Sequence, residues 1–366
     1  MKTIQIINVR WFNATAWYGL YLARLLRDAG HETLVITQQG TEADEKAKEW
    51  GFTPLHFDLN SSNPLKLLRA YVQLYKLIKD FTPDVVNCHR GEGFILWGLL
   101  RKFSGSFKLV RTRGDQRLPK NNLPNRWLHT NVADAVIATN SVMTNHFISK
   151  LNVPEFKVST IFGGVDTEKF AFSSAGRADF RKKLGYDDSH FVVSMLGRFD
   201  EVKGQKELIE AVGKLYHENG MKHLRLMLLG FETATTQAEV ESWIAENNIE
   251  EITCITGQVS DVAAAISAMD LGVIASKWSE TIARAAFEIM ACERPLISTG
   301  VGVMPDFMDK DAMFEAGNSE ALAKAIEWAA TNESHLKKIF DLQQKEIAEL
   351  SGQHFLEKTL NVYSSL

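Results

Sequence analysis

The first forty residues alternate between strand-like and helix-like apolar patterns, and this alternation restricts the fold more than any other feature. Residues 3–9 are apolar and strand-like, residues 20–26 carry leucine and alanine at helical spacing, and residues 33–37 are apolar again. Gly30 ends the helical segment. Strand, helix and strand within about 35 residues form a βαβ unit, which requires a right-handed crossover and parallel strands.

The alternation continues to about residue 150 and predicts an open, doubly wound α/β domain over residues 1–165. The further strands expected there are 84–88, 107–112 and 135–138, and the further helices are 65–80, 93–103, 125–133 and 142–149.

A turn-rich segment, residues 162–166, precedes a second series of the same kind. Its expected strands are 191–196, 224–230, 251–256, 271–275 and 295–299, and its expected helices are 205–217, 237–247, 281–291 and 319–331. We therefore expect a second doubly wound domain over 166–350. Residues 336–366 are expected to be helical, and the segment 351–366 is expected to pack back on the first domain. Two such Rossmann-like domains would face a central cleft, where ligands of open α/β folds bind.

The composition excludes several classes of protein. Of the 366 residues, 45% are hydrophobic and 23% charged, as in globular proteins, and no run of 18 apolar residues predicts a membrane span. Cys88, Cys254 and Cys292 are odd in number and lack CxxC spacing, which argues against a disulfide framework or a zinc site. No secretory leader is evident, so a cytoplasmic location is expected.

The charge is distributed unevenly along the chain. Residues 1–165 contain 21 Lys and Arg against 13 Asp and Glu, which gives +8, whereas the remainder holds 20 against 32, which gives −12. Eight bases lie within 101–126 beside Asp115 alone. This surface is either a solvated face or a contact for anionic lipid or a phosphorylated acceptor, and no motif for nucleic acid accompanies it. The apolar and basic helix at 94–103 fits core packing better than a membrane interface.

Two polar clusters follow strands of the second domain. The first cluster spans Gly197 to Gly204. Its Arg198 and Lys203 flank a turn and can converge on one anion, such as a diphosphate leaving group. The alternative is a surface ion-pair network with Asp200 and Glu201. In the second, Ser279 to Glu288, a helix expected to begin at Thr281 would direct backbone N–H groups at a phosphate.

Two carboxylates of the second cluster fit a sugar nucleotide. Glu280 and Glu288 would lie about 12 Å apart on one side of a continuous helix, the separation of a sugar and a ribose across a diphosphate. Each carboxylate can accept hydrogen bonds from the hydroxyls of a vicinal diol. An ordinary amphipathic helix with solvated acids is the alternative.

These clusters resemble the motifs of the family 4 glycosyltransferases, retaining enzymes of the GT-B fold. Gly-Arg-Phe-x-x-x-Lys-Gly at 197–204 and Glu-x7-Glu at 280–288 resemble the paired motifs of the family's C-terminal domain. Weaker similarities lie at Gly30-His31, at Pro83-Asp84-Val85-Val86 with His89, at 163–166, and at 257–259 and 295–299.

The resemblance implies a role for individual residues. Arg198 and Lys203 would neutralise the donor diphosphate, Glu280 would contact the donor sugar, and Glu288 the nucleotide ribose. Backbone groups at Gly197, Thr281 and Ile282 would meet the phosphates, and Gln258 and Val259 fall in the loop that contacts the base. Front-face substitution, in which the leaving phosphate helps take the acceptor proton, would need no carboxylate pair at the anomeric carbon.

Two segments depart from the family pattern. The first loop lacks Gly-Gly and reads Trp11 to Ala16, so Asn13 or Thr15 would have to donate side-chain hydrogen bonds to a phosphate instead. Arg113-Gly114-Asp115 stands where many members carry a histidine. Arg113 is a candidate for binding an anionic group and Asp115 for orienting a hydroxyl, while His89 is either a ligand contact or a core histidine.

Two further motifs are weaker than they look. Asp309-Lys310-Asp311 follows a loop rather than a strand, so it is interpreted as surface and no metal is expected. Gly300-Val301-Gly302 lacks the third glycine of a dinucleotide fingerprint and is expected to line the donor pocket, so no bound cofactor is implied.

The sequence therefore predicts a metal-independent, retaining glycosyltransferase. It would move a sugar from a nucleotide-diphosphate donor to a hydroxyl of a glycan or lipid-linked acceptor, in lipopolysaccharide or other cell-envelope polysaccharide synthesis. It is expected in the cytoplasm, with peripheral contact to an anionic membrane. The alternatives are a nucleotide-sugar epimerase of the same architecture and a non-catalytic nucleotide-sugar-binding protein.

Overall fold

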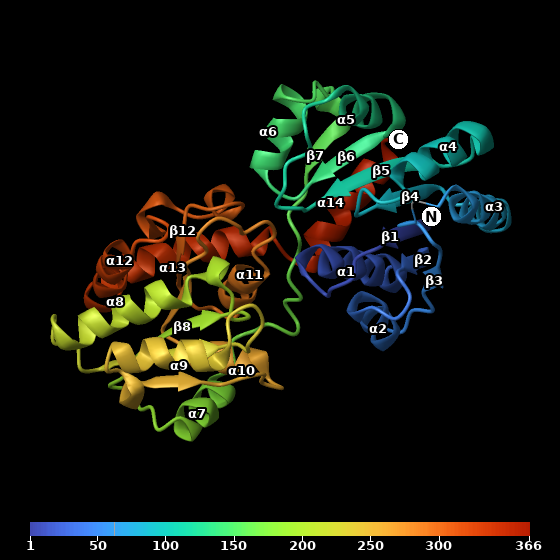
Figure 1. The fold of residues 1–366 in the computed structure, drawn as a ribbon. Helices are drawn as coiled ribbons and strands as arrows, with labels where there is room; N and C mark the ends of the chain where they lie inside the picture. Colours follow the sequence, from blue (N-terminus) through green and yellow to red (C-terminus); the bar gives the residue numbers. More distant parts are fainter. Residues whose placement is uncertain (62) are drawn as a thin grey trace. The chain divides into compact units, whose positions relative to one another are not determined.

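The chain divides into two compact units in a computed structural model that describes residues 1–61 and 63–366. The first unit comprises Met1–Gly163 and Gly352–Leu366, and the second comprises Gly164–Ser351 (Figure 1). The first boundary, expected after residue 165, lies two residues after that of the structure. The second, expected after residue 350, lies one residue before it. We call these parts the N-terminal unit and the C-terminal unit.

A parallel sheet forms the centre of the N-terminal unit. Its described residues form seven strands in the order β3-β2-β1-β4-β5-β6-β7. The strands are β1 (Lys2–Ile7), β2 (Glu32–Thr37), β3 (Leu55–His56), β4 (Val85–Cys88), β5 (Lys108–Arg113), β6 (Ala135–Ala138) and β7 (Val158–Thr160). Chain order reverses beside β1, because β2 pairs with one edge of β1 and β4 with the other. This is the doubly wound topology that the alternation of patterns predicts.

Helices cover both faces of this sheet (Figure 1). They are α1 (Ala14–Asp28), α2 (Glu42–Glu49), α3 (Pro64–Phe81), α4 (Phe94–Ser104), α5 (Leu123–Trp127), α6 (Ser141–Ser149) and α14 (Gly352–Ser364). Apolar residues of α3, α4 and α6 pack on one face, and those of α1 and α2 pack on the other. The C-terminal helix α14 packs beside α1, where the Tyr21 and Phe355 rings lie 6.1 Å apart.

A second parallel sheet lies in the C-terminal unit, all of whose residues the structure describes. Its six strands have the order β10-β9-β8-β11-β12-β13. They are β8 (Phe191–Leu196), β9 (Leu224–Leu229), β10 (Thr253–Ile255), β11 (Leu271–Ile274), β12 (Leu296–Thr299) and β13 (Met313–Phe314). The helices are α7 (Ser174–Lys183), α8 (Gln205–His217), α9 (Gln237–Glu246), α10 (Val262–Ser267), α11 (Arg284–Ala291), α12 (Ser319–Thr331) and α13 (Glu333–Ala348).

Three expected elements differ in detail from the structure. The helix expected over 125–133 is α5 followed by one π-helical turn, Leu128–Val132. The strand expected over 251–256 is a 3₁₀ turn, Glu250–Ile252, followed by the short strand β10. The helical segment expected over 336–366 is two helices, α13 and α14, since residues 349–351 interrupt it. Short turns of this kind leave no separate periodicity in the sequence.

No helix among the described residues is long and apolar enough to cross a membrane. Cys88, Cys254 and Cys292 are all unpaired.

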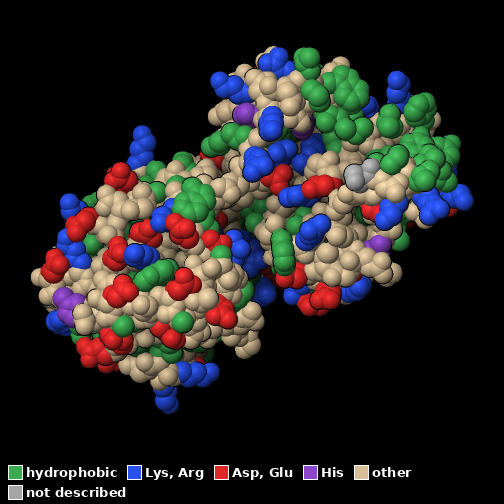
Figure 2. Space-filling model, viewed as in Figure 1, with side chains coloured by type: hydrophobic (Ala, Val, Ile, Leu, Met, Phe, Trp, Pro, Cys, Tyr) green, Lys and Arg blue, Asp and Glu red, His purple; other side chains and the backbone are tan. Residues whose placement is uncertain are grey.

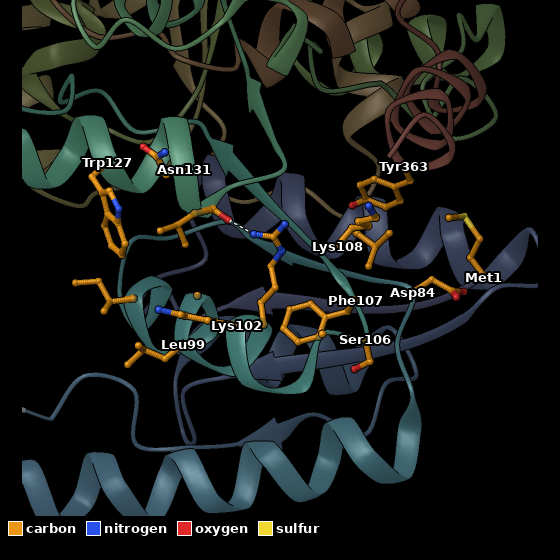
Figure 3. Close-up of a pocket in the computed structure, with 16 residues that line it drawn as sticks. Met1, Asp84, Leu99, Lys102, Ser106, Phe107, Lys108, Trp127, Asn131 and Tyr363 are labelled. Atoms are coloured by element: carbon orange, nitrogen blue, oxygen red, sulfur yellow. Dashed lines mark hydrogen bonds between the residues drawn. The ribbon is translucent and has the colours of Figure 1, made fainter.

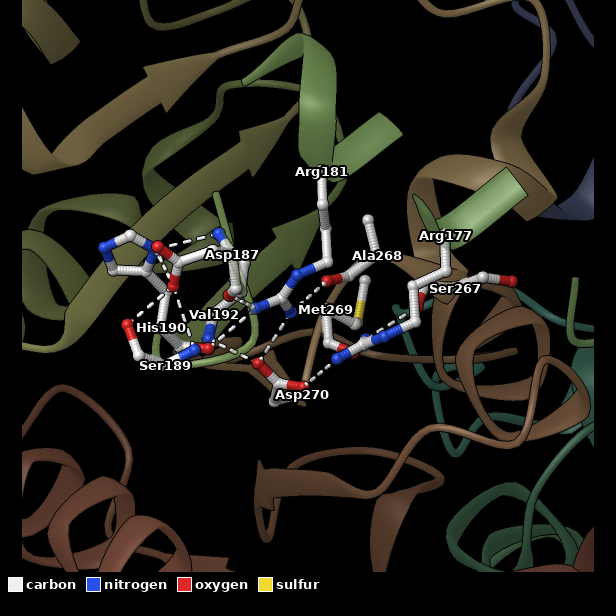
Figure 4. Close-up of polar contacts among 10 residues, drawn as sticks. All are labelled: Arg177, Arg181, Asp187, Ser189, His190, Val192, Ser267, Ala268, Met269 and Asp270. Carbon is white, nitrogen blue, oxygen red and sulfur yellow. Dashed lines mark hydrogen bonds and ion pairs between the residues drawn. The ribbon is translucent and has the colours of Figure 1, made fainter. Parts of the chain in front are cut away.

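A charged network ties α7 to the C-terminal sheet (Figure 4). Asp270 directly precedes β11, and its two carboxylate oxygens lie 2.6 Å from Arg177 Nη2 and 3.0 Å from Arg181 Nη1. The Val192 amide at the start of β8 donates to the same carboxylate at 2.8 Å. Since the Arg181 side chain is only 4% exposed, Asp270 supplies the negative charge that compensates the buried guanidinium.

We predict that Asp270→Ala destabilises the C-terminal unit by about 3 kcal/mol, because it leaves the buried Arg181 guanidinium without its carboxylate. Urea unfolding followed by far-ultraviolet circular dichroism measures the change. Asp179→Ala removes an exposed carboxylate from the same helix α7 and serves as the matched control, expected within about 0.5 kcal/mol of wild type. Equal unfolding midpoints for the two variants would contradict a structural role for the network.

Two histidines are buried in the N-terminal unit. His89 follows β4, and its Nε2 lies 2.9 Å from Gln5 Oε1, while its Nδ1 has no hydrogen-bond partner among the described residues. Burial, and to a smaller extent the charge of Arg111, lowers the pKa of His89 to about 3. Burial likewise lowers the pKa of His129 to about 4. Both imidazoles are therefore neutral in the folded protein at neutral pH.

We predict that acid weakens the fold through these two histidines. Their folded pKa values lie below the ordinary histidine pKa of 6.5, so the unfolded chain binds more protons and stability falls as the pH drops below about 6.5. When the pH falls from about 7.5 to about 4.5, the free energy of unfolding should decrease in both proteins. The decrease should be smaller in His89→Gln than in wild type, by on the order of 2 kcal/mol. His223→Gln, which alters an exposed histidine, is the control. An unchanged pH dependence in His89→Gln would rule out this contribution.

Candidate active site

The loop after β8 carries the first predicted cluster and packs against the end of β11. Gly204 has a φ of 77°, and a Cβ atom there would lie 2.3 Å from the Ala275 carbonyl oxygen. The Lys277 amide also donates to the Val202 carbonyl oxygen at 2.8 Å. Only glycine permits this approach at position 204, and it brings Lys203 beside the segment that follows β11.

Lys203 and Glu280 form an ion pair across these two loops. Lys203 Nζ lies 2.7 Å from Glu280 Oε2, and Ser276 Oγ donates to the same oxygen at 2.6 Å. The Thr299 hydroxyl, at the end of β12, donates to the Ser276 carbonyl oxygen at 2.7 Å. Glu280 is only 8% exposed, so its carboxylate is held by two donors in a largely dry environment.

The loop after β12 holds the Glu280 backbone. Gly302 has a φ of 65°, and a Cβ atom there would lie 1.9 Å from the Glu280 carbonyl oxygen. The Val303 amide donates to that oxygen at 2.7 Å. Because β8, β11 and β12 are neighbours in the sheet, the loops at their carboxyl ends meet at one edge. Ligands of open α/β sheets bind at this edge.

Arg198 has a different partner from Lys203. Its Nη2 lies 2.8 Å from Asp200 Oδ2, and about half of its side chain is exposed. Gln205 Nε2 donates to the Arg198 carbonyl oxygen at 2.9 Å, which anchors the backbone but leaves the guanidinium at the surface. The structure therefore joins Lys203 to Glu280 and gives Arg198 the Asp200 ion pair that the sequence analysis named as the alternative.

The expected start of the helix after Glu280 was wrong. Helix α11 begins at Arg284 rather than at Thr281, because Ala283 has a left-handed φ of 53°. Ile282 and Ala283 are buried, which shows that packing fixes this bend in the chain. Glu280 consequently lies outside the helix, and the 12 Å spacing expected for Glu280 and Glu288 on one continuous helix does not apply.

Glu288 lies on α11 and is 95% buried. Arg284 Nε lies 2.9 Å from its Oε1. Burial raises the pKa of Glu288 above its usual value, against the opposing charges of Arg284 and Lys169. A carboxylate that is buried in this way is shielded from bulk water. It can accept hydrogen bonds from a ligand that enters the site, such as a diol.

The other predicted donor contacts lie along the same edge of the sheet. Gly197 directly follows β8, and Thr281 and Ile282 lie in the loop before α11. Gln258 and Val259 lie between β10 and α10, and Gln258 is exposed. Since β9 separates β10 from β8, this pair stands two strands away from Lys203.

In the N-terminal unit, the prediction that Asn13 or Thr15 donates to a phosphate is not supported. Asn13 caps α1, because its side-chain oxygen accepts from the Ala16 amide at 3.1 Å. Thr15 lies in the first turn of α1 and is 7% exposed. The helix cap thus explains the asparagine without a ligand.

Arg113 and Asp115 belong to a cluster at the carboxyl ends of β4 and β5. Asp115 lies 3.2 Å from Arg90 Nη1, and 3.8 Å from both Arg111 Nη2 and Arg113 Nε. Arg90 also forms a two-point ion pair with Glu92. We call Arg90, Glu92, Arg111, Arg113 and Asp115 the arginine cluster; it contains three cations and two carboxylates.

Two buried donors of the arginine cluster have no hydrogen-bond partner among the described residues, although both lie 3.8 Å from the Asp115 carboxylate. They are Arg111 Nη2 and Arg113 Nε. Arg111 is 1% exposed. Burial and, to a smaller extent, the positive charge of Arg113 lower the pKa of Arg111 to about 10. Buried donors of this kind are usually paired, so the arrangement suits an added anion.

Ser276, Thr299 and Arg90 were not predicted as site residues, and Arg111 was counted only among the bases of 101–126. Thr299 is far from Glu280 in the sequence, and Ser276 precedes the helix expected from Thr281, so helical spacing did not connect either hydroxyl to Glu280. Arg111 could have been singled out, because it stands inside an expected core strand, where an arginine is rarely buried without a partner.

Two family models match most of the chain. Residues 16–169 match the family model described as Glycosyltransferase Family 4, and residues 176–345 match that described as Glycosyl transferases group 1. The putative glycosyltransferase EpsD of Bacillus subtilis is 26% identical over 317 residues, which cover 81% of each chain. An Escherichia coli UDP-Gal:alpha-D-GlcNAc-diphosphoundecaprenol alpha-1,3-galactosyltransferase is 24% identical over 65% of this chain and 63% of its own.

Solved structures share the whole fold. A glycosyltransferase from Rickettsia africae superposes with a TM-score of 0.87 at 19% identity, over 100% of this chain and 98% of that one. Anabaena HepE, crystallised with UDP, superposes with a TM-score of 0.86 at 19% identity over the full length of both chains. The two units thus have the GT-B architecture, and the chain belongs to glycosyltransferase family 4.

Proposed function

We propose that this glycosyltransferase moves a sugar from a nucleotide-diphosphate donor to a hydroxyl of a glycan or lipid-linked acceptor, with retention at the anomeric carbon. The observation that carries the proposal is the ion pair of Lys203 and Glu280 at the carboxyl edge of the C-terminal sheet. It sets one cation beside one nearly buried carboxylate. A diphosphate needs the cation and a sugar diol needs the carboxylate.

Lys203 would act on the leaving group. As the bond from the anomeric carbon to the β-phosphate oxygen breaks, negative charge grows on that oxygen. An ammonium already held in place by Glu280 stabilises this charge without first having to be ordered. Arg198, exposed and tethered to Asp200, would add a second cation to the diphosphate.

Retention requires that the new bond form on the face from which the leaving group departs. The acceptor oxygen would attack the anomeric carbon there, and its proton would pass to the departing phosphate oxygen. No carboxylate nucleophile is then needed, so Glu280 is assigned to the sugar hydroxyls. Ser276 would keep the Glu280 carboxylate oriented. Glu288 would take the ribose, and Gly197, Gln258, Val259, Thr281 and Ile282 the phosphates and base.

The relatives suggest which substrates to test first. The Escherichia coli relative is named for transfer from UDP-galactose to a diphosphoundecaprenol-linked sugar, and the Anabaena structure contains UDP. A lipid diphosphate would also match the arginine cluster, whose buried donors suit an anion. We therefore propose a UDP-sugar and a phosphorylated lipid-linked acceptor, used at the cytoplasmic side in assembling lipopolysaccharide or another cell-envelope polysaccharide.

We predict that Lys203→Ala lowers kcat by about 10²-fold, because roughly 3 kcal/mol of transition-state stabilisation is lost. The assay measures the UDP that is released during transfer. The donors are UDP-galactose, UDP-glucose or UDP-N-acetylglucosamine, and the acceptor is undecaprenyl-diphosphate-linked N-acetylglucosamine. Lys206→Ala, which alters an exposed lysine three residues on, is the matched control and should keep wild-type kcat.

The same assay separates the other candidate activities. Product NMR should show the anomeric configuration of the donor. Isomerisation of the donor without acceptor would instead indicate an epimerase. Binding of UDP without transfer to a broad panel of acceptors would indicate a non-catalytic protein. Wild-type kcat in Lys203→Ala would remove the role proposed for the ion pair.

We predict that Arg113→Gln raises the KM for the phosphorylated acceptor by about tenfold or more and leaves the KM for the UDP-sugar unchanged. The loss corresponds to one charge-assisted hydrogen bond of about 1.5–3 kcal/mol. Arg117→Gln, an exposed neighbour, is the control. A rise confined to the donor KM would assign the arginine cluster to the donor instead.

A further inference from the structure

Helix α4 is apolar on two faces. Phe94, Trp97 and Leu100 are buried against the sheet, as the sequence analysis expected. Ile95, Leu99 and Phe103 point away from the core, and Phe103 is 68% exposed. Core packing, which includes Leu96, therefore accounts for four of the seven large apolar residues in this helix, and the other three are largely exposed.

The neighbouring helices extend this surface. Helix α3 packs beside α4, and α4 contacts the turn that follows α5 through Arg101 and the Val132 carbonyl oxygen. Both neighbours expose large apolar side chains at helical spacing. We define the apolar face as Leu65, Leu68, Val72, Tyr75, Ile95, Leu99, Phe103, Leu123 and Trp127, all of them exposed.

Basic residues surround the apolar face. Between residues 63 and 127 the sequence has 13 Lys and Arg against four Asp and Glu, a net charge of +9. The exposed bases on α3, on α4, at the start of β5 and in the loop after β5 are Lys66, Arg69, Lys76, Lys79, Lys102, Lys108, Arg117 and Lys120. Figure 2 shows hydrophobic side chains gathered over α3, α4 and α5, with Lys and Arg at their margin.

A pocket of about 720 Å³ lies in the same region (Figure 3). Ile95, Leu99 and Trp127 of the apolar face line it together with Phe107, and Lys102 and Lys108 lie at its rim. Asp84 and Lys108 place it at the amino ends of β4 and β5, away from the carboxyl edge where substrates of parallel sheets bind. The pocket therefore belongs to the apolar face rather than to the arginine cluster.

We infer that the apolar face docks on an anionic lipid bilayer. Aliphatic and aromatic side chains on adjacent helices would enter the headgroup boundary, and the surrounding lysines and arginines would meet anionic headgroups. A second copy of this chain fits less well, because a symmetric pair would bring the exposed bases around two such faces together, among them Lys66, Arg69 and Lys102. This inference is independent of the chemistry proposed for Lys203 and Glu280.

Co-sedimentation of the full chain with vesicles tests the inference. We expect binding to vesicles of phosphatidylglycerol and phosphatidylethanolamine, weakened by salt, and little binding to phosphatidylcholine alone. The triple variant Ile95→Ser, Leu99→Ser, Phe103→Ser should lower the partition coefficient by about tenfold or more. The variant Lys66→Glu, Arg69→Glu, Lys102→Glu alters only charges and should do the same without disturbing the core.

Matched controls change exposed residues elsewhere. Phe156→Ser and Trp328→Ser remove exposed aromatic rings, and Lys182→Glu and Lys324→Glu invert exposed charges outside the apolar face. These variants should bind vesicles as wild type does, and circular dichroism should show all variants folded. Equal loss in the controls, or no vesicle binding by wild type, would overturn the inference. A dimer in solution that the triple variant dissociates would also overturn it, because the face would then bind a second copy.

Discussion

One ion pair organises the C-terminal unit at its functional edge. Lys203 and Glu280 are 77 residues apart in sequence, yet their charged atoms lie 2.7 Å apart. Bringing a lysine to a nearly buried carboxylate is costly unless the carboxylate has further donors, and Ser276 supplies one. Gly204, next to Lys203, and Gly302, in the loop after β12 that holds the Glu280 backbone, stand where any side chain would collide with backbone. The glycines are thus a condition for the ion pair.

The arrangement has a consequence for catalysis. In the proposed mechanism, a cation that is already ordered needs no reorganisation when charge appears on a leaving phosphate. Such preorganisation lowers the activation free energy most in a site that largely excludes water. Arg198 is more exposed and is held only by Asp200, so it is the more adaptable of the two cations. The N-terminal unit carries a different kind of feature, since two buried donors of its arginine cluster have no hydrogen-bond partner among the described residues.

Much of the fold and part of the site could be predicted from the sequence. The strand and helix periods predict both doubly wound sheets. Lys203 and Glu280 mark the two loops, after β8 and β11, that the structure joins through an ion pair. The start of α11 was not predictable, because Thr281 to Ala283 have no helix-breaking residue and only packing bends Ala283. Partners that lie far apart in the sequence, such as Thr299 with Ser276 and Arg90 with Asp115, leave no spacing that a sequence could reveal. Asn13 has a local role that the sequence analysis did not include, because its side-chain oxygen caps α1.

The most direct test of the central claim is a double-mutant cycle on kcat/KM with Lys203→Ala, Glu280→Gln and the double variant. If the two side chains act as one unit, the double variant should be about as slow as the slower single variant, roughly 10²-fold below wild type. Losses that multiply, to about 10⁴-fold for two such effects, would show that the residues act independently and would contradict the account.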